Sequence, residues 1–280
     1  MALPFYIVAS FTTSPLKGNP AGVILNADVL SNEEMQRIAS ELQCSETAFV
    51  FKSNRADYKL RYFSPLKEVD LCGHATIATF HVMMNEGLIR DGCFKVETKA
   101  GMIGIEIKEG RPYMEQMKPV FKEIHTKKEE IAKSLGIDER DIADLPIEAS
   151  STGLFSLNIP LRTLDAMKRM QPDFEKIKEI CLAEGIGSFF LFTFETIRQD
   201  CFIHARCFAP LYGVNEDPVT GTANGACAAY LKKHDLLKSK CYKAEQGCEI
   251  GRDGIVYVEV NDRIKVGGDA CIVMKGKITD

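Results

Sequence analysis

The hydrophobic and polar positions of the chain form strand-like runs and helix-like segments in an order that occurs twice. In the first half, four apolar runs have the length and composition of strands: residues 4–11, 23–26, 47–52 and 57–64. Two segments predict helices, an amphipathic one at 31–43 and an apolar one at 74–87 that ends at a glycine. Residues 93–116 predict further strands separated by turns.

Two of the predicted helices begin with a capping box, in which a hydroxyl residue is followed three positions later by glutamate. Ser31 and Glu34 form this pattern at the start of 31–43, and Thr126 and Glu129 form it at the start of a charged helix at 126–137. The apolar stripe of the first helix consists of Met35, Ile38, Ala39 and Leu42. Residues 138–151 that follow the second helix have a loop-like composition.

The order of elements then recurs in the second half. Strand-like runs occupy residues 153–161, 188–195, 201–209 and 242–268. Helices are predicted at 172–185, starting near Pro172, and at 222–236. The sequence "RYFSPL" at Arg61 and "RCFAPL" at Arg206 occupies the same place in both halves, before a glycine turn and an alanine-rich helix. We interpret this as a duplicated unit, which predicts two related lobes with a ligand site in the cleft between them.

Composition and charge exclude several classes of protein. Of 280 residues, 35 are Lys or Arg and 39 are Asp or Glu, and the net charge of −4 gives no reason to expect nucleic acid as a partner. No apolar stretch approaches the roughly 20 residues of a membrane span. The first apolar run has no basic region before it, so we expect no signal peptide. Ten scattered cysteines without Cys-x-x-Cys spacing predict reduced thiols, a cytoplasmic protein and no metal site.

The two glycine turns, "LCGHAT" and "TGTAN", place Gly73 and Gly221 just before the two alanine-rich helices. Unpaired N–H groups at a helix N-terminus favour anions, and glycine lets a ligand approach the backbone. Either turn alone is typical of an ordinary helix cap. The symmetric pair predicts a site for a carboxylate.

Several polar residues near the turns are candidates for proton transfer. Glu46 lies where the sequence turns apolar, so burial would raise the pKa of its carboxyl; alternatively it caps the end of helix 31–43. His74 could shuttle a proton or be a packed core residue, and Asp217 could relay protons or hold its own turn. Cys72 could act as a base at a helix N-terminus, whereas Thr222 can donate a hydrogen bond but is no base. The other four histidines have no partner pattern and are expected to pack.

In sequence order, the motifs "GNPAGVIL", "SETAFV", "RYFSPLKEVDLCGHAT", "RCFAPLYGVNEDPVTGTA" and "GRDGIVYVEV" resemble those of the PhzF-like isomerases of phenazine biosynthesis. The resemblance spans nearly the whole chain. It implies the α+β diaminopimelate epimerase-like fold, with two pseudo-symmetric lobes, each a curved, mostly antiparallel sheet around a central helix. We expect residues 1–117 with about 268–280 to form the N-terminal lobe and residues 118–267 the C-terminal lobe.

The resemblance also implies roles for individual residues. Glu46, the glutamate of "SETAF", is implied as the proton-transferring residue, with His74 and Asp217 as its catalytic partners. The residues implied to bind or position substrate are Ser45, Gly73, Gly221, Thr222, Asn19 and Cys72. In related diaminopimelate epimerases the Cys72 position pairs with a second cysteine, whose place we assign to Thr222, so a two-thiol mechanism is not expected.

The implied function is an isomerase that moves a proton and a double bond in a small carboxylate-bearing metabolite. It would use side-chain acid/base catalysis without cofactor or metal, and a homodimer is expected. Two alternatives remain open at this stage. One is an amino-acid epimerase or racemase that uses Cys72, and the other is a non-catalytic protein that binds small carboxylates on this scaffold.

Overall fold

The computed structural model describes residues 3–279 of the chain. They divide into two compact units, Met1–Glu115 with Gly267–Asp280 and Gln116–Val266. The C-terminal strand therefore belongs to the same unit as the N-terminal strand, and the two pair antiparallel from Leu3 to Ser10. Among the described residues, no helix is both long and apolar enough to cross a bilayer.

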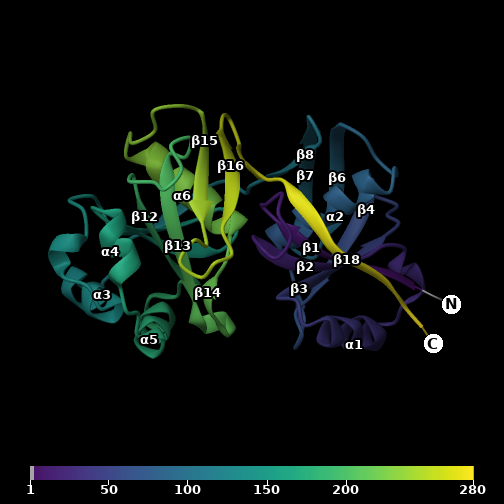
Figure 1. The fold of residues 1–280 in the computed structure, drawn as a ribbon, viewed down its shortest axis with the longest axis horizontal. Coiled ribbons are helices and arrows are strands. Elements are labelled where there is room, and N and C mark those ends of the chain that lie inside the picture. Colours follow the sequence, from purple (N-terminus) through teal and green to yellow (C-terminus); the bar gives the residue numbers. More distant parts are fainter. Residues whose placement is uncertain (1–2, 280) are drawn as a thin grey trace. The chain divides into compact units, whose positions relative to one another are not determined.

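The first unit is a sheet around one helix, α2 (Gly73–Asn85), with a second helix, α1 (Asn32–Leu42), outside it (Figure 1). Its strands are β1 (Leu3–Ser10), β2 (Asn19–Ile24), β3 (Glu46–Phe51), β4 (Tyr58–Phe63), β5 (Glu68–Val69), β6 (Gly92–Thr98), β7 (Gly101–Lys108), β8 (Arg111–Glu115) and β18 (Ala270–Ile278). A 3-10 turn, η1 (Ala27–Val29), precedes α1. The predicted capping box of α1 is confirmed, because Ser31 and Glu34 exchange side chain-to-backbone hydrogen bonds.

The second unit has the same plan around helix α6 (Gly221–Lys233). Its strands are β9 (Val120–Lys122), β10 (Glu148–Ser151), β11 (Phe155–Pro160), β12 (Ser188–Thr193), β13 (Ile203–Ala209), β14 (Val214–Asp217), β15 (Cys241–Gln246), β16 (Gly254–Val260) and β17 (Ile264–Gly267). Its other helices are α3 (Lys128–Leu135), α4 (Leu164–Arg169) and α5 (Phe174–Glu184), with 3-10 turns η2 (Glu139–Asp141) and η3 (Pro210–Tyr212).

Strand pairing follows one pattern in both units. In the first, β2 and β3 are parallel, β3 and β4 antiparallel, β4 and β6 parallel, and β6 and β7 antiparallel. In the second, the same four relations join β11 to β12, β12 to β13, β13 to β15, and β15 to β16. Each parallel step is bridged by helix: α1, α2 and α6 bridge one step each, and α4 and α5 together bridge the step from β11 to β12. The α+β class expected from the sequence is therefore confirmed.

The central helices α2 and α6 are buried on all sides. In each, ten of 13 residues are buried, which leaves no solvent-facing stripe. A helix that is apolar all round can be stable only inside a core, and small residues such as the alanines of α6 let strands approach it closely. These two helices organise their units.

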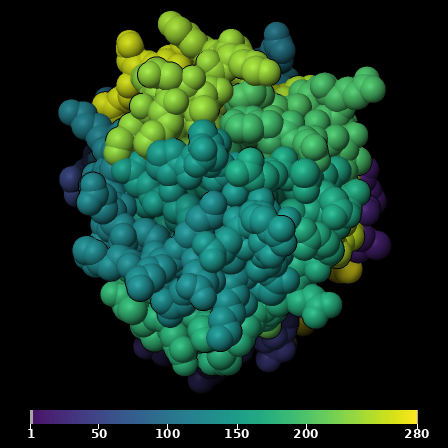
Figure 2. Space-filling view, turned by 90° about the vertical axis from the view of Figure 1, so that its left-hand side faces the viewer, coloured from purple at the N-terminus to yellow at the C-terminus, as the bar shows by residue number. Residues whose placement is uncertain are grey.

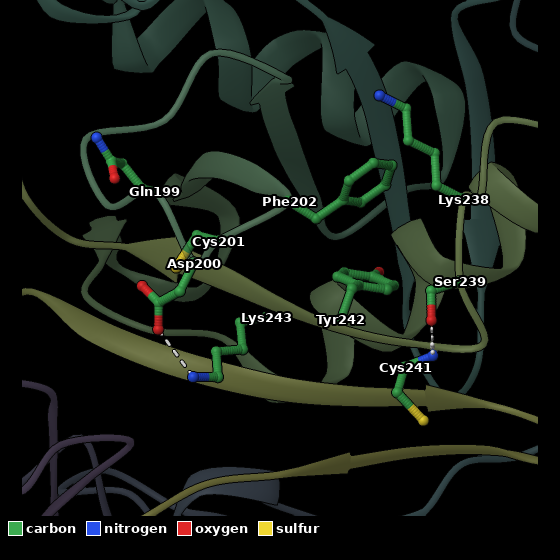
Figure 3. Close-up of a pocket in the computed structure, with 9 residues that line it drawn as sticks. All are labelled: Gln199, Asp200, Cys201, Phe202, Lys238, Ser239, Cys241, Tyr242 and Lys243. Carbon is green, nitrogen blue, oxygen red and sulfur yellow. Dashed lines mark hydrogen bonds and ion pairs between the residues drawn. The ribbon is translucent and has the colours of Figure 1, made fainter.

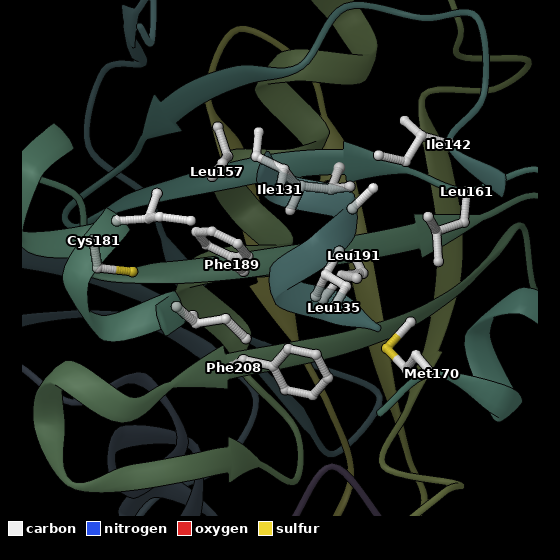
Figure 4. Close-up of a cluster of buried hydrophobic side chains, with 14 of the residues drawn as sticks. Ile131, Leu135, Ile142, Leu157, Leu161, Met170, Cys181, Phe189, Leu191 and Phe208 are labelled. Atoms are coloured by element: carbon white, nitrogen blue, oxygen red, sulfur yellow. The ribbon is translucent and has the colours of Figure 1, made fainter. Parts of the chain in front are cut away.

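A second hydrophobic cluster in the Gln116–Val266 unit packs outer helices against the sheet. Ile131 and Leu135 of α3 contact the cluster that includes Leu157, Phe189 and Phe208 from three strands (Figure 4). Teal and green segments from this region form the face seen in the space-filling view (Figure 2). The charged residues of α3 lie on the surface, while its apolar residues complete the core.

Three sequence predictions for this unit were wrong. The segment predicted as a loop contains β10, whose four residues are buried and pair with both β9 and β11. Helix α4 was not predicted, because its six residues are too few to show a helical period. The predicted capping box at Thr126 does not form; α3 starts at Lys128, and the Thr126 hydroxyl instead donates to Glu184 Oε1 at 2.6 Å.

The repeated Arg-x-Phe motif makes the same contacts in both units. Arg61 donates from Nε to Glu68 Oε1 at 2.7 Å and lies 5.1 Å from the ring centre of Phe63. Arg206 donates from Nε and a terminal nitrogen to both oxygens of Glu216, at 2.9 and 2.7 Å. It also lies 5.0 Å from the ring centre of Phe208. Each arginine thereby fixes the short strand that leads into a central helix.

His204 lies in a buried cluster that the sequence pattern did not indicate. Its ring is fully buried, with Nδ1 2.8 Å from Glu245 Oε1 and Nε2 2.8 Å from Glu249 Oε1. Burial disfavours the imidazolium, but the two carboxylates outweigh it and raise the pKa of His204 to about 9. Glu245 also accepts backbone N–H groups of Ile197 and Arg198, so the cluster ties the 196–200 loop to β13 and β15.

The two arginine clamps differ in burial, which gives a paired test. The Arg206 and Glu216 side chains are 8% and 9% exposed, whereas those of Arg61 and Glu68 are 21% and 24% exposed. Arg206→Met leaves a buried carboxylate without its partner, so we expect a loss of about 3–5 kcal/mol in unfolding free energy. Arg61→Met should cost about 1 kcal/mol. Equal losses in denaturant titrations of the two variants would contradict this interpretation.

The His204 cluster predicts a pH dependence of stability. Because the pKa is higher in the folded protein than the ordinary 6.5, the contribution is fully present below about pH 6.5. It is lost as the pH rises through about 9, and the loss corresponds to roughly 3 kcal/mol. Thermal melting between pH 6 and 10 should lose most of this slope in His204→Gln and keep it in His125→Gln, a variant of an exposed histidine. An unchanged slope in His204→Gln would exclude the assignment.

Candidate functional site

Three reactive side chains of the first unit meet at the start of α2. The imidazole Nε2 of His74 lies 3.3 Å from Glu46 Oε2, and the Cys72 thiol donates to the same carboxylate oxygen at 3.5 Å. Cys72 Sγ also lies 3.4 Å from His74 Nδ1. Ser45 Oγ lies 3.2 Å from His74 Nε2 and donates to the Pro20 carbonyl at 3.3 Å. We call Glu46, Cys72 and His74 the proton-transfer cluster.

Regular structure holds each member of this cluster. Glu46 is the first residue of β3, opposite Ala21 in the parallel β2 strand, and Cys72 is the N-cap of α2. The Thr76 hydroxyl donates to the Cys72 carbonyl at 2.7 Å, and the Ser10 hydroxyl donates to the His74 carbonyl at the same distance. Because these bonds fix the backbone, the cluster has little freedom to separate.

The environment of Glu46 favours its protonated form. Burial raises the pKa of the Glu46 carboxyl, and the hydrogen bonds from Cys72 and Ser45 offset only part of this effect. The side chain is still 24% exposed, so it is not sealed from solvent. The alternative that Glu46 caps helix α1 does not hold, since the C-cap of α1 is Gln43.

The start of α6 in the second unit is held by a different network. The Thr220 hydroxyl donates to Asp217 Oδ2 at 2.5 Å, so Asp217 holds its own turn. Gln246 is fully buried; its Oε1 accepts from the Thr220 backbone and the Asn224 side chain, and its Nε2 donates to the Asp217 carbonyl and the Thr220 hydroxyl. Sequence reasoning missed Gln246, whose only distinction is its place at the end of a strand.

The N-caps of the two central helices show which residue of the second unit is equivalent to Cys72. Cys72 precedes Gly73 as the N-cap of α2, and Thr220 precedes Gly221 as the N-cap of α6. The position equivalent to Cys72 is therefore Thr220, and the assignment of that place to Thr222 was wrong by two residues. A hydroxyl still replaces the second thiol.

The remaining predicted residues lie in one unit or the other. Asn19 is buried at the start of β2, opposite Ser10 of β1, and Gly73 is the first residue of α2. Gly221 and Thr222 are the first two residues of α6 in the second unit. The structure thus brings Ser45, Glu46, Cys72 and His74 together within the first unit.

The proton-transfer cluster also has the donor set of a metal site. Within residues 3–279, one ligand atom from each of Glu46, Cys72 and His74 lies within 4.8 Å of the others. The sequence criterion was Cys-x-x-Cys spacing, which cannot detect a Cys-x-His pair completed by a distant carboxylate.

Two surface cavities occur elsewhere in the second unit. One, of about 240 Å³, is lined by residues that include Phe202 and Tyr242, and Lys243 at its edge is paired with Asp200 at 2.8 Å (Figure 3). The other, of about 370 Å³, lies between the end of α6 and the 260–262 turn. Neither is lined by a residue of the proton-transfer cluster or by Asp217, so neither is the predicted site.

Comparison with known families accounts for this architecture. Residues 8–276 match the family model described as phenazine biosynthesis-like protein, PhzC-PhzF. The chain belongs to the PhzF family. It is therefore an isomerase of that family, as its sequence motifs predict.

Individual relatives support the assignment of the chain to the PhzF family of isomerases. The chain is 42% identical to an uncharacterized isomerase, YfhB, of Bacillus subtilis, over 95% of this chain and 92% of that one. It is 29% identical to trans-2,3-dihydro-3-hydroxyanthranilate isomerase of Pseudomonas chlororaphis, over 98% of both. The crystal structure of a Bacillus anthracis PhzF-family protein matches with a TM-score of 0.91, 35% identity and full coverage of both chains.

A more distant structure supports the epimerase-like fold. A hydroxyproline epimerase of Agrobacterium vitis matches with a TM-score of 0.66 at 10% identity, over 99% of this chain and 92% of that one. At this identity the likeness concerns the fold alone. It confirms the predicted class of two-lobed α+β proteins.

The Gln246 network predicts a stabilising role in this PhzF-family protein. Gln246→Met removes two acceptor and two donor contacts at the start of α6, so we expect a loss of at least about 2 kcal/mol in unfolding free energy. Gln199→Met, at an exposed position, should change it by no more than about 0.5 kcal/mol. Denaturant titration distinguishes them, and equal stability of both variants would contradict the role of the network.

Proposed function

We propose that the protein moves a proton and a double bond in a small carboxylate-bearing metabolite, with Glu46 as the group that carries the proton. The observation that supports this proposal is the contact of the Glu46 carboxylate with both His74 Nε2 and Cys72 Sγ. A carboxyl in this position can deliver a proton at one carbon after it has taken one from another.

In this proposal the neighbours of Glu46 determine whether its carboxyl is protonated. His74 shares Nε2 between the Glu46 carboxylate and the Ser45 hydroxyl, so it can accept or supply a proton without moving far. Asp217, Gly221, Thr222 and Asn19 remain predicted participants because of the family resemblance. The turns at the two helix N-termini are the predicted holders of the substrate carboxylate.

The name of the Pseudomonas relative suggests a substrate class. That protein is a trans-2,3-dihydro-3-hydroxyanthranilate isomerase, and its likeness covers 98% of this chain. We therefore propose an unsaturated, hydroxylated cyclic amino acid or a similar small acid as the substrate.

An epimerase mechanism with Cys72 is the second candidate, since its thiol lies beside Glu46 at a helix N-terminus. Two-base epimerisation needs a second acid/base group, and the equivalent N-cap is Thr220, which does not ionise near neutral pH. This difference favours the proton shift over epimerisation.

The proposal predicts the effect of removing the acid. In D₂O, with trans-2,3-dihydro-3-hydroxyanthranilate as the first compound tested, the wild type should form an isomer with deuterium at the reprotonated carbon. Glu46→Gln keeps the shape of the side chain but cannot carry the proton, so turnover should fall on the order of 10² to 10⁴-fold. Proton NMR measures both results.

The matched control is Glu41→Gln, an exposed glutamate five residues earlier in α1, which should keep wild-type turnover. Wild-type turnover by Glu46→Gln would refute the assigned role. Deuterium at an α-carbon without a double-bond shift, lost in Cys72→Ser and kept in Glu46→Gln, would establish the epimerase instead.

A further inference from the structure

The three side chains of the proton-transfer cluster place one sulfur, one nitrogen and one oxygen donor within 4.8 Å of one another. A thiolate, an imidazole and a carboxylate are the ligands that Zn²⁺ prefers, and three protein ligands leave a fourth position for water or a ligand. The cluster lies wholly within the first unit, on the start of β3 and the start of α2.

The distances between the donor atoms fit one tetrahedral ion. With zinc bonds of about 2.3 Å to sulfur and 2.0–2.2 Å to nitrogen and oxygen, tetrahedral angles separate the donors by roughly 3.4–3.6 Å. The observed separations are 3.3 Å between Glu46 Oε2 and His74 Nε2, 3.5 Å between Glu46 Oε2 and Cys72 Sγ, and 3.8 Å between Cys72 Sγ and His74 Nε2. These separations differ from the tetrahedral values by a few tenths of an ångström, although the direction of the imidazole must also change.

We propose that Glu46, Cys72 and His74 form a Zn²⁺ site, and that ion binding and proton transfer exclude each other. Zinc replaces the thiol proton of Cys72, which is released to solvent, and takes lone pairs of Glu46 and His74. The bound carboxylate then cannot accept a proton from substrate. This inhibitory consequence rests on the proposed function, whereas the site itself does not.

The structure also specifies what must move. Cys72 Sγ lies at similar distances from both ring nitrogens of His74, 3.4 and 3.8 Å, so the ring must turn about its Cβ–Cγ bond to aim Nε2 at the ion. The backbone need not move, because Thr76 and Ser10 already hold the carbonyls of Cys72 and His74. Ser45 Oγ, 3.2 Å from Nε2, loses its contact with that nitrogen when Nε2 binds the ion, and its hydroxyl then remains available to a water.

Cobalt(II) is the direct probe of this site, because a thiolate bound to Co²⁺ gives a near-ultraviolet charge-transfer band and tetrahedral Co²⁺ gives intense visible bands. We expect one equivalent of Co²⁺ to produce both, and one equivalent of Zn²⁺ to remove them. Cys72→Ser should abolish the charge-transfer band and weaken binding at least about 100-fold, since even indirect partners of a metal contribute 10- to 100-fold. Mg²⁺, which prefers oxygen ligands, should not compete.

Cys93→Ser is the matched control, because Cys93 is an exposed thiol of the same unit. It should keep the band and the affinity, and a band that survives in Cys72→Ser but not in Cys93→Ser would overturn the proposal. X-ray absorption of the zinc-loaded wild type needs no variant and should detect one sulfur at about 2.3 Å. Absence of sulfur from the zinc shell would equally overturn it.

Turnover measurements with and without zinc test the zinc site and the proposed function separately. If turnover is found, stoichiometric Zn²⁺ should abolish it and a chelator should restore it. A cobalt spectrum with thiolate ligation in a protein without turnover would support the site and refute the proposed function. Turnover that persists in the zinc-loaded protein would refute the proposal that zinc binding and proton transfer exclude each other.

Discussion

The arginine clamp before each central helix is the constraint on which both units depend. A helix that is buried on all sides must enter the core at a fixed point, and the strand that leads into it is only two to four residues long. The clamps of Arg61 with Glu68 and Arg206 with Glu216 fix that strand, and the following aromatic ring covers the guanidinium. A charge pair is costly to bury, but its rigid geometry fixes the position of the turn that follows.

This repeated scaffold carries chemistry that is not repeated. The first residue of β3 is Glu46, whereas the first residue of β12 is Ser188, whose hydroxyl pairs with Ser156 at 2.8 Å inside the second unit. The N-caps likewise differ, with Cys72 in one unit and Thr220 in the other. Duplication therefore explains the two helix N-termini, while the carboxyl at the start of β3 has no counterpart at the start of β12.

The sequence predicted what local patterns determine and missed what tertiary contacts determine. The α1 capping box and the apolar central helices follow from spacing alone, and both were predicted correctly. Thr126 has the same capping pattern, yet its hydroxyl bonds to Glu184, 58 residues away, which no local pattern encodes. Gln246 and His204 were missed for the same reason, since their partners come from other loops and strands. The geometry of Glu46 with His74 was predicted only through the family motifs.

One physical cause connects acid/base chemistry with metal affinity at Glu46. Burial disfavours the negative charge of the Glu46 carboxylate. A proton, a hydrogen bond from the Cys72 thiol or a cation can each offset this unfavourable free energy. Of these, only the proton can be passed on to a substrate carbon, as the proposed catalysis requires. In the proposed site one zinc ion would bind Glu46, Cys72 and His74 together and displace the proton of the thiol. The proposed proton transfer and the proposed zinc site therefore rest on the same three side chains, and the buried carboxyl of Glu46 is the group that connects them.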